Sequence, residues 1–393
     1  MNPASVQLIP LHSRQNAGRM VSLARRSVGA MLAFGWSLAL PAHGTTPFTQ
    51  SCPVAVYPSA NWKAVDPAGA GWSREKLNAA RDYSASIHSS SVMILEHGVV
   101  IDEWGDVAKK ISSYSVRKSL ISALYGIYSA EGVIDINQTL QELRIDDAPD
   151  PLTAQEKQAR VLDLLRARSG VYHLVDFETA YMNKMRPKRD SHAPGTYWYY
   201  NNWDFNALGT IFEAKTGMPI SEAFYKRIAK PIGMQDFGVA DFYYIGGPIS
   251  QHRAYHFEIT ARDLARFGLL YLRLGCWDGR QIVPRSWVEK SSHAEEMVQA
   301  FGEDAGGYEY LWWVEYNGVH FPGVTVPSGT YSARGAGGHY LVVIPALDLV
   351  VVHRFDNDPP RRDSATVTEW ADHGIKKTEF GHLLKLILES KPH

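Results

Sequence analysis

Ser115 and Lys118 are three residues apart, a spacing that places two side chains on the same face of a helix. A serine in the first turn of a helix lies close to unpaired backbone N–H groups and to the positive end of the helix dipole. A lysine amine held against such a serine in a partly dry site can lose its proton and act as a base. The pair therefore suggests a nucleophile with its own base, although Ser-x-x-Lys also occurs by chance in many long chains.

The residues that follow Ser115 have the pattern of a buried helix. Apolar Leu120, Leu124 and Ile127 keep the three-and-four spacing of a helical face that packs on a core. Gly132 stands where the C-terminal glycine of a helix is expected. The sequence therefore predicts a helix that begins at the candidate nucleophile and ends at this glycine.

Two further segments carry residues that could complete a site. Residues 194–203 read Pro-Gly-Thr-Tyr-Trp-Tyr-Tyr-Asn-Asn-Trp, in which Tyr-x-Asn occurs twice in overlap. Residues 333–338 read Ala-Arg-Gly-Ala-Gly-Gly and lie between two predicted strands. A tyrosine, whose ordinary pKa is about 10, serves as a base only if nearby positive charge lowers that value. Lys118 could supply this charge or act as the base itself, and the sequence leaves the choice open.

The order of these three segments resembles that in class C β-lactamases, DD-peptidases and their esterase and 6-aminohexanoate-dimer-hydrolase relatives. In that family a Pro-Gly-Thr loop leads over three residues to Tyr-x-Asn and, seven residues later, to the glycine of a Leu-Gly pair. Counting from Pro194 places these residues at Tyr200, Asn202 and Gly209. The resemblance covers roughly residues 70–390, and it implies that the asparagine orients the lysine of the first motif and contacts the substrate.

The resemblance also implies a role for the other matched residues. Ser115 is the expected nucleophile, and Lys118 and Tyr200 together are the expected general base and acid. Gly335 is expected to keep the edge of its strand open for substrate. The backbone N–H groups of Ser115 and Ala336 are expected to hold the oxyanion that forms when the serine attacks a carbonyl group.

The third segment departs from the Lys-Thr-Gly form of the β-lactamases, in which the lysine helps to engage the carboxylate of the drug. Ala333 stands at the position of that lysine, which favours a substrate other than a β-lactam. Arg334 could replace the lysine, but neighbouring positions of a strand point to opposite faces of the sheet. A literal Lys-Thr-Gly at residues 215–217 lies at a predicted helix end, where we expect it to cap the helix.

Predicted strands lie at both ends of the chain, and predicted helices lie mostly between them. The strands cover 92–95, 99–101, 311–316, 330–333, 340–344 and 349–353. Besides the helix that begins at Ser115, predicted helices cover 161–166, 205–214, 221–228, 264–272 and 380–388. A further helix is predicted at 72–88, with Ser73 as its N-cap. This order predicts an α/β fold of the α+β type, with an antiparallel sheet flanked by helices and an inserted all-α domain at about residues 133–240. That is the β-lactamase/DD-peptidase-like architecture.

The first 44 residues differ in composition from the rest. They contain four arginines and no acidic residue, and an apolar run from Ser27 to Leu40 ends in small residues. These are the parts of a secretory signal peptide with cleavage after Gly44, although an uncleaved anchor is an alternative. We therefore expect an exported protein, periplasmic or secreted, with no stable membrane span after processing. An N-terminal arm at 45–70 and a hydrolase domain at 71–393 would follow.

Composition narrows the expected partners. The chain has 393 residues and a formal charge of −1, which does not indicate binding to nucleic acid. Its two cysteines, Cys52 and Cys276, could pair in an exported protein, and the sequence leaves this open. They form no close metal motif, and the chain has no His-Glu-x-x-His run, so neither a metal nor another cofactor is expected.

The resulting hypothesis is a serine hydrolase that cleaves a small amide or ester through an acyl-enzyme on Ser115. The alternatives are β-lactamase or DD-peptidase activity, and a catalytically silent relative that binds peptidoglycan fragments. Tyr172 and Trp198 are expected to line the substrate pocket, and His192 to brace the loop before the second motif. Other aromatic or histidine side chains that could line the pocket are His173, Tyr197, Trp203, Trp312 and Trp313.

Overall fold

The computed structural model describes residues 52, 54–300, 302–358, 363, 365, 369 and 373–391. The predicted signal peptide and the first residues of the predicted N-terminal arm lie outside the described residues. The described part of the arm contains one 3-10 turn, Ala68–Ala70. A disulfide joins Cys52 to Cys276, which answers the pairing question that the sequence left open. No helix in the described part of the chain is both long and apolar enough to span a bilayer.

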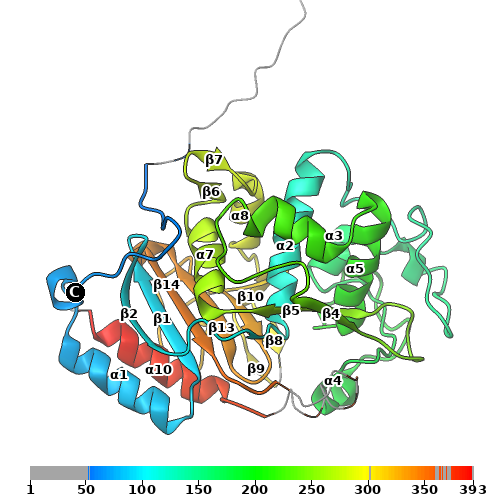
Figure 1. The fold of residues 1–393 in the computed structure, drawn as a ribbon. Helices are drawn as coiled ribbons and strands as arrows, with labels where there is room; N and C mark the ends of the chain where they lie inside the picture. The colour runs from blue at the N-terminus through cyan, green and yellow to red at the C-terminus, as the bar shows by residue number, and fades with distance from the viewer. Residues whose placement is uncertain are drawn as a thin grey trace, which may run out of the picture. The chain divides into compact units, whose positions relative to one another are not determined.

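Seven antiparallel strands form the main sheet, and the sheet joins strands from the two ends of the chain (Figure 1). Their order is β10-β11-β12-β13-β14-β1-β2. The strands are β1 (Ser91–Glu96), β2 (Val99–Gly105), β10 (Gly307–Glu309), β11 (Trp312–Val314), β12 (Tyr331–Gly335), β13 (His339–Ile344) and β14 (Leu349–Arg354). In the β1–β14 pair Ser91 lies opposite Arg354 and Glu96 lies opposite Leu349. The predicted fold class is confirmed, although β10 was not predicted.

Helices cover both faces of this sheet (Figure 1). Two helices that contact each other lie on one face, α1 (Arg74–Ser86) and α10 (Lys377–Glu389). The helices on the other face are α2 (Val116–Ala130) and α7 (Ala261–Leu272). The apolar residues of β1 alternate between the two: Val92 and Ile94 belong to the core under α1 and α10, whereas Met93 and Leu95 belong to the core under α2 and α7.

Between residues 133 and 240 the regular elements of the described chain are helices joined by long loops. The α-helices are α3 (Val161–Leu165), α4 (Ala180–Met185), α5 (Asn202–Thr216) and α6 (Ile220–Phe224), with a 3-10 turn at Glu156–Gln158 and a π-helical turn at Tyr225–Ala229. The described residues belong to one compact unit, and the boundaries predicted for an inserted domain stay a prediction.

Smaller elements complete the described chain. A three-stranded antiparallel sheet, which was not predicted, has the order β3 (Ile111–Ser112), β5 (Ala254–Ile259), β4 (Phe242–Ile245). The rest are β6 (Cys276–Trp277), β7 (Arg280–Gln281), α8 (Arg285–Ser291), β8 (Gln299–Ala300), β9 (Glu303–Asp304) and a 3-10 turn at Pro345–Leu347. β3 matters most for the site, because the chain passes from it directly into the start of α2.

Local signals set the helix ends as predicted. The Ser73 side chain accepts a hydrogen bond from the Lys76 N–H at the start of α1, as an N-cap does. Gly132, with φ 73°, follows the end of α2. Gly217 ends α5 with φ 64°, so the literal Lys-Thr-Gly run is a helix C-cap.

Candidate active site

Ser115 lies at the start of α2, directly after a residue with an uncommon backbone conformation. Tyr114 has φ 43°, a left-handed value that is unfavourable for a bulky side chain. The Tyr114 ring is fully buried and stacks on His339 with the ring centres 5.1 Å apart. Its hydroxyl donates to the carbonyl oxygen of Asn357 at 2.9 Å. These contacts hold the strained residue in place, and they fix the position at which the serine enters the helix.

The amine of Lys118 connects two of the predicted catalytic groups. Its Nζ lies 2.6 Å from Ser115 Oγ and 2.8 Å from the hydroxyl oxygen of Tyr200. Lys118 is buried, and the rings of Tyr200 and Phe205 each lie 4.5 Å from its Nζ. The structure therefore brings the first and second motifs into direct contact, in the arrangement that the resemblance implied.

Burial has opposite effects on the two candidate bases. Burial, together with the neighbouring Arg117 guanidinium, lowers the pKa of Lys118 well below its usual value. Burial raises the pKa of Tyr200 to about 12, although its hydrogen bond with Ser115 and the positive charges of Arg117 and Arg334 oppose the rise. Both shifts favour the neutral forms of the two side chains, which suits the amine to accept a proton and the phenol to pass one on.

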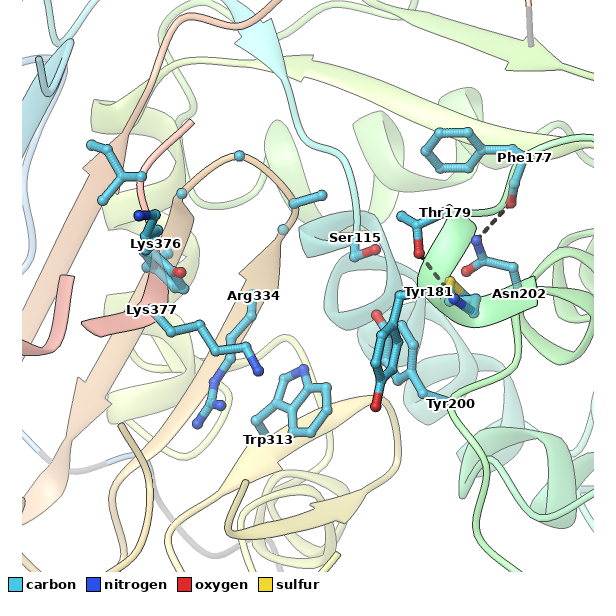
Figure 2. A pocket seen from close by; sticks show the side chains of 17 residues that line it. Ser115, Phe177, Thr179, Tyr181, Tyr200, Asn202, Trp313, Arg334, Lys376 and Lys377 are labelled. Atoms are coloured by element: carbon cyan, nitrogen blue, oxygen red, sulfur yellow. Dashed lines mark hydrogen bonds between the residues drawn. The ribbon is translucent and has the colours of Figure 1, made fainter. Parts of the chain in front are cut away.

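A cavity of about 290 Å³ opens in front of Ser115 (Figure 2). One wall comes from the loop and short helix around α4, and the opposite wall comes from the end of β12, the turn after it and the start of α10. The lining side chains from these walls and from the floor are Phe177, Thr179, Tyr181, Met182, Tyr200, Asn202, Trp313, Arg334, Ala336, Tyr340, Ile375, Lys376 and Lys377. Most of this lining is apolar or aromatic, so the serine hydroxyl faces a partly dry pocket.

Gly335 ends β12 beside the N-terminus of α2. A side chain at this position would place its Cβ 2.9 Å from the Ser113 carbonyl oxygen and 3.3 Å from the Ser115 nitrogen. Glycine is therefore required for the strand to approach the serine backbone this closely. Ala336, the next residue, lines the same cavity as Ser115. Both predicted oxyanion donors thus lie at the cavity, with glycine making room between them.

The structure separates the two overlapping Tyr-x-Asn patterns. Tyr200 and Asn202 line the cavity, as counting from the Pro-Gly-Thr loop predicted. The Tyr199 hydroxyl instead donates to the Met182 carbonyl oxygen at 2.8 Å, and Asn201 caps α5. The Asn202 amide donates to the Phe177 carbonyl oxygen at 2.7 Å, and its buried Oδ1 has no partner within the described structure. The expected contact of Asn202 with Lys118 is therefore not formed.

Two aromatic residues that were expected to line the substrate pocket do not line this cavity. Tyr172 packs edge-on against His192 and Tyr199, and its hydroxyl lies 3.2 Å from His192 Nδ1. Trp198 packs behind the site, with its ring edge-on to Trp313 and the ring centres 6.0 Å apart. Both predictions rested on aromatic density, and these rings support the loop that carries Tyr200 instead. His192 braces that loop as expected, since its ring stacks on Tyr197.

The position of Arg334 corrects the expectation that this side chain would point away from the cavity. Ala333 is fully buried in the core, whereas Arg334 lines the cavity, although strand alternation had argued against the arginine. The Arg334 guanidinium donates to the Ser332 hydroxyl and to the His320 carbonyl oxygen, and it lies over the Trp313 ring. Burial lowers its pKa, yet a guanidinium remains charged at neutral pH.

Several lining residues were not identified from the sequence. Phe177, Tyr181 and Met182 approach the cavity because the Asn202 amide binds the backbone of the loop before α4. Lys377 approaches from the start of α10, where its amine pairs with Glu303 at 2.8 Å. Thr179 followed by an apolar helical turn is a usable N-cap signal for α4, but no local pattern places that helix at the site. Among the described residues, no group of three His, Cys, Asp or Glu side chains could hold a metal ion.

Comparison with known proteins places this geometry in a family. The sequence model described as "Beta-lactamase" matches residues 77–373, about three quarters of the chain. The chain belongs to the β-lactamase family. This confirms the resemblance that the three motifs indicated. The matched range includes all of the motif residues and every strand of the main sheet.

Solved structures show the same β-lactamase-family fold at low sequence identity. A Bacillus anthracis protein named as a 6-aminohexanoate-dimer hydrolase has a TM-score of 0.59 and 19% identity, with 86% of this chain and 89% of that chain covered. A penicillin-binding protein homologue from Caulobacter crescentus has a TM-score of 0.56 and 13% identity, with 81% and 99% covered. A family VIII carboxylesterase has a TM-score of 0.53 and 15% identity, with 77% and 98% covered.

Sequence comparison also finds a protein of Alkalihalophilus pseudofirmus whose function is uncharacterised. It is 20% identical over 260 residues, which are 62% of this chain and 72% of that protein. Members of the β-lactamase family with this fold are serine hydrolases. The family and the fold therefore agree with the class of chemistry that the three motifs indicated.

Proposed function

We propose that this chain is a serine hydrolase that cleaves a small amide or ester through an acyl-enzyme on Ser115. The observation that carries the proposal is the Lys118 amine, which lies 2.6 Å from Ser115 Oγ and 2.8 Å from the Tyr200 hydroxyl beside a cavity of about 290 Å³. An activated serine needs a basic group within hydrogen-bond reach and a third group that continues the proton path. Lys118 and Tyr200 meet these two requirements.

In the acylation step, Ser115 Oγ attacks the carbonyl carbon and its proton moves to the neutral Lys118 amine. Lys118 is a better acceptor than the Tyr200 phenol, because the uncharged amine is favoured whereas the phenolate is disfavoured. The backbone N–H groups of Ser115 and Ala336 hold the oxygen anion. The bond to the leaving group then breaks, and the proton reaches the leaving oxygen or nitrogen through the Tyr200 hydroxyl.

Water completes the cycle. A water molecule attacks the acyl carbon and gives one proton to the Lys118–Tyr200 pair, and that proton then returns to Ser115 Oγ as the carboxylic acid leaves. The free serine and the neutral amine are restored without any external proton source. The same pair thus serves as base in each attack and as acid in each departure.

β-Lactam hydrolysis is the second candidate reaction. Ala333 gives no cation at the family's lysine position, which favours an ester or a linear amide. The Arg334 guanidinium nevertheless lines the cavity and could contact the carboxylate of a β-lactam. A catalytically silent binder is less favoured, because binding alone requires none of the contacts among the serine, the lysine and the tyrosine.

We also propose that the protein is exported. The Cys52–Cys276 disulfide supports this localisation, because disulfides persist in oxidising compartments. The basic, apolar and small-residue pattern of residues 1–44 supports it independently. Fractionation of the native host with an antibody to the hydrolase domain would test the proposal, and protein confined to the cytosol would overturn it.

A panel of three substrates tests the proposed reaction class. The purified protein is assayed with p-nitrophenyl acetate, with the linear dimer of 6-aminohexanoate and with nitrocefin, alongside the Ser115→Ala variant. Turnover of the ester or the linear amide that disappears in the variant supports the proposal. Turnover of nitrocefin alone makes the protein a β-lactamase, and no turnover of any substrate favours the silent binder.

A further inference from the structure

Arg117 is a buried arginine that the mechanism above does not use. It precedes Lys118 on α2, and its side chain is fully buried. Its Nη2 donates to Asn206 Oδ1 at 3.0 Å, and its Cζ lies 4.5 Å from the centre of the Tyr255 ring. Its Nε and Nη1 atoms have no hydrogen-bond partner among the described residues. The guanidinium is therefore buried with one hydrogen bond to an amide, and the Tyr255 side chain is a further polar neighbour.

Two other buried arginines show what a structural arginine looks like in this protein. Arg266 donates to the carbonyl oxygens of Ile232, Ser59 and Ala60. Arg354 donates to three carbonyl oxygens and to the ring of His339. Each of them tethers separate segments of backbone. Arg117 binds no backbone carbonyl, so holding the fold together does not account for its burial in the same way.

No carboxylate pairs with Arg117 in the described structure, and the groups around it and Lys118 are mostly neutral. The neutral neighbours are Tyr200 before α5, Tyr255 and His256 on β5, and Tyr308 on β10. Arg334 on β12 adds a second positive charge near Tyr200. Burial, together with the Arg117 charge, keeps the pKa of His256 well below its usual value. The Arg117 charge therefore acts without a counter-ion in a region that excludes water and salt.

Two effects compete at the Lys118 amine. The ring faces of Tyr200 and Phe205, each 4.5 Å away, favour its protonated form. Burial and the adjacent Arg117 charge favour its neutral form, and they lower the pKa of Lys118 well below its usual value. Arg117 is the neighbouring positive charge on the same helix, so its removal should favour the protonated form of the Lys118 amine.

We propose that Arg117 is a positioning residue, whose uncompensated buried charge disfavours a second positive charge on Lys118 and favours the negative charge that develops at Ser115 during acylation. The inference rests on the proposed function of Ser115 and Lys118. It differs from a packing role, because what matters is the charge of the side chain rather than its volume or its contacts with Asn206 and Tyr255.

The test compares Arg117→Met and Arg117→Gln, which remove the charge, with Arg117→Lys, which retains it. The rate at which a fluorophosphonate labels Ser115 is measured from acidic to alkaline pH, and thermal unfolding is followed for each variant. We expect the acid limb of the rate profile to move to higher pH by about one unit in the uncharged variants, which makes labelling on the order of tenfold slower at pH values on that limb. The difference in labelling rate between the uncharged variants and the unmodified protein should become smaller at alkaline pH. The Arg117→Lys variant should restore much of the original rate profile.

The matched control is Arg266→Met, which removes a buried arginine from α7. We expect it to lower the unfolding temperature, because three backbone carbonyls lose their donor, without moving the acid limb. A limb that moves equally in this control would show that the shift reflects general loosening, and the proposal would fail.

The remaining outcomes are also decisive. An unmoved acid limb in folded Arg117→Met or Arg117→Gln would overturn the inference while leaving the proposed hydrolase intact. Misfolding of both uncharged variants with a folded lysine variant would make Arg117 a structural residue and would overturn it as well. Absence of labelling in the unmodified protein at every pH would instead contradict the proposed function itself.

Discussion

The backbone nitrogen of Ser115 lies so close to Gly335 that a Cβ at the glycine would stand 3.3 Å from it. The same Cβ would stand 2.9 Å from the Ser113 carbonyl oxygen. This contact joins the end of a C-terminal strand to the start of α2, and it is where the proposed oxyanion would form. The absence of a side chain at Gly335 is therefore needed for the two backbone segments to come together at the site.

Gly335→Ala should slow acylation strongly while the protein remains folded. The added methyl group presses on two backbone atoms and shifts the donors that hold the oxyanion, so we expect a loss of about 10²–10³-fold in the acylation rate. The loss of stability should be roughly 1–3 kcal/mol. Stopped-flow acylation by p-nitrophenyl acetate measures the first quantity, and urea unfolding measures the second.

Gly69→Ala is the matched control for this substitution. An added Cβ at Gly69 would meet only Asp66, at 3.9 Å. Gly69 does not line the Ser115 cavity. Its acylation rate should equal that of the unmodified protein. An unchanged rate in Gly335→Ala as well would show that the junction does not shape the oxyanion site.

Tyr200→Phe should lower kcat by about 10²–10⁴-fold with little change in stability. The ring would keep its stacking on Trp313, where the ring centres lie 5.4 Å apart, and only the hydroxyl that continues the proton path is lost. Steady-state kinetics with an ester and an amide check the effect. The amide should suffer more, because its leaving nitrogen has the greater need of a proton.

Tyr199→Phe tests whether the correct tyrosine has been assigned. The Tyr199 hydroxyl donates to the Met182 carbonyl oxygen and lines no part of the Ser115 cavity. This variant should therefore retain nearly full activity. If it lost activity while Tyr200→Phe kept it, the assignment of the second motif would be reversed.

His173 lies between two buried carboxylates, at 3.4 Å from Asp147 and 3.3 Å from Glu156. Although burial opposes the change, these contacts raise the pKa of His173 to about 9. A group with a raised pKa stabilises the fold fully below its unfolded value of about 6.5, and its contribution is lost as the pH rises through about 9. The unfolding free energy should fall across that window by an amount on the order of 3 kcal/mol.

The His173→Gln variant isolates this contribution. It should show a much flatter profile of unfolding free energy across the same window, together with lower stability at neutral pH because two carboxylates lose their charged partner. Urea unfolding at a series of pH values checks both. A variant whose profile falls as steeply as that of the unmodified protein would show that another group titrates there.

Loss of the Cys52–Cys276 disulfide should lower the unfolding free energy by about 2–5 kcal/mol. The double variant Cys52→Ser/Cys276→Ser removes the link that closes a loop of 224 residues in the unfolded chain. Thermal unfolding under matched conditions checks the loss, and the active site should remain intact because neither cysteine lines it. Two thiols that react with Ellman's reagent in the unreduced, denatured protein would contradict the pairing.

The sequence predicted the parts of the site that depend on local structure. Ser115 and Lys118 share a helix whose apolar face and terminal glycine are visible in the sequence. Counting from the Pro-Gly-Thr loop selected Tyr200 over Tyr199, and the short apolar runs at both ends of the chain predicted the main sheet. The helix and the strands are specified by neighbours in sequence, whereas the choice of Tyr200 came from the family pattern that the sequence resembles.

The parts that failed depend on how distant segments pack. Aromatic density suggested Tyr172 and Trp198 as pocket residues. Their rings instead pack against other aromatic rings, those of Tyr199 and Trp313. Tyr181 lines the cavity from α4, which follows a long loop, and Lys377 lines it from the start of α10. No local pattern specifies where such segments meet.

The most direct test of the account is the site of covalent labelling. The protein is treated with a fluorophosphonate and analysed by intact mass and by peptide mapping, next to Ser115→Ala. We expect one adduct per chain, located on Ser115, and none in the variant. Labelling that is equal in the variant, or that maps to another residue, would contradict the central claim that Ser115 is the nucleophile.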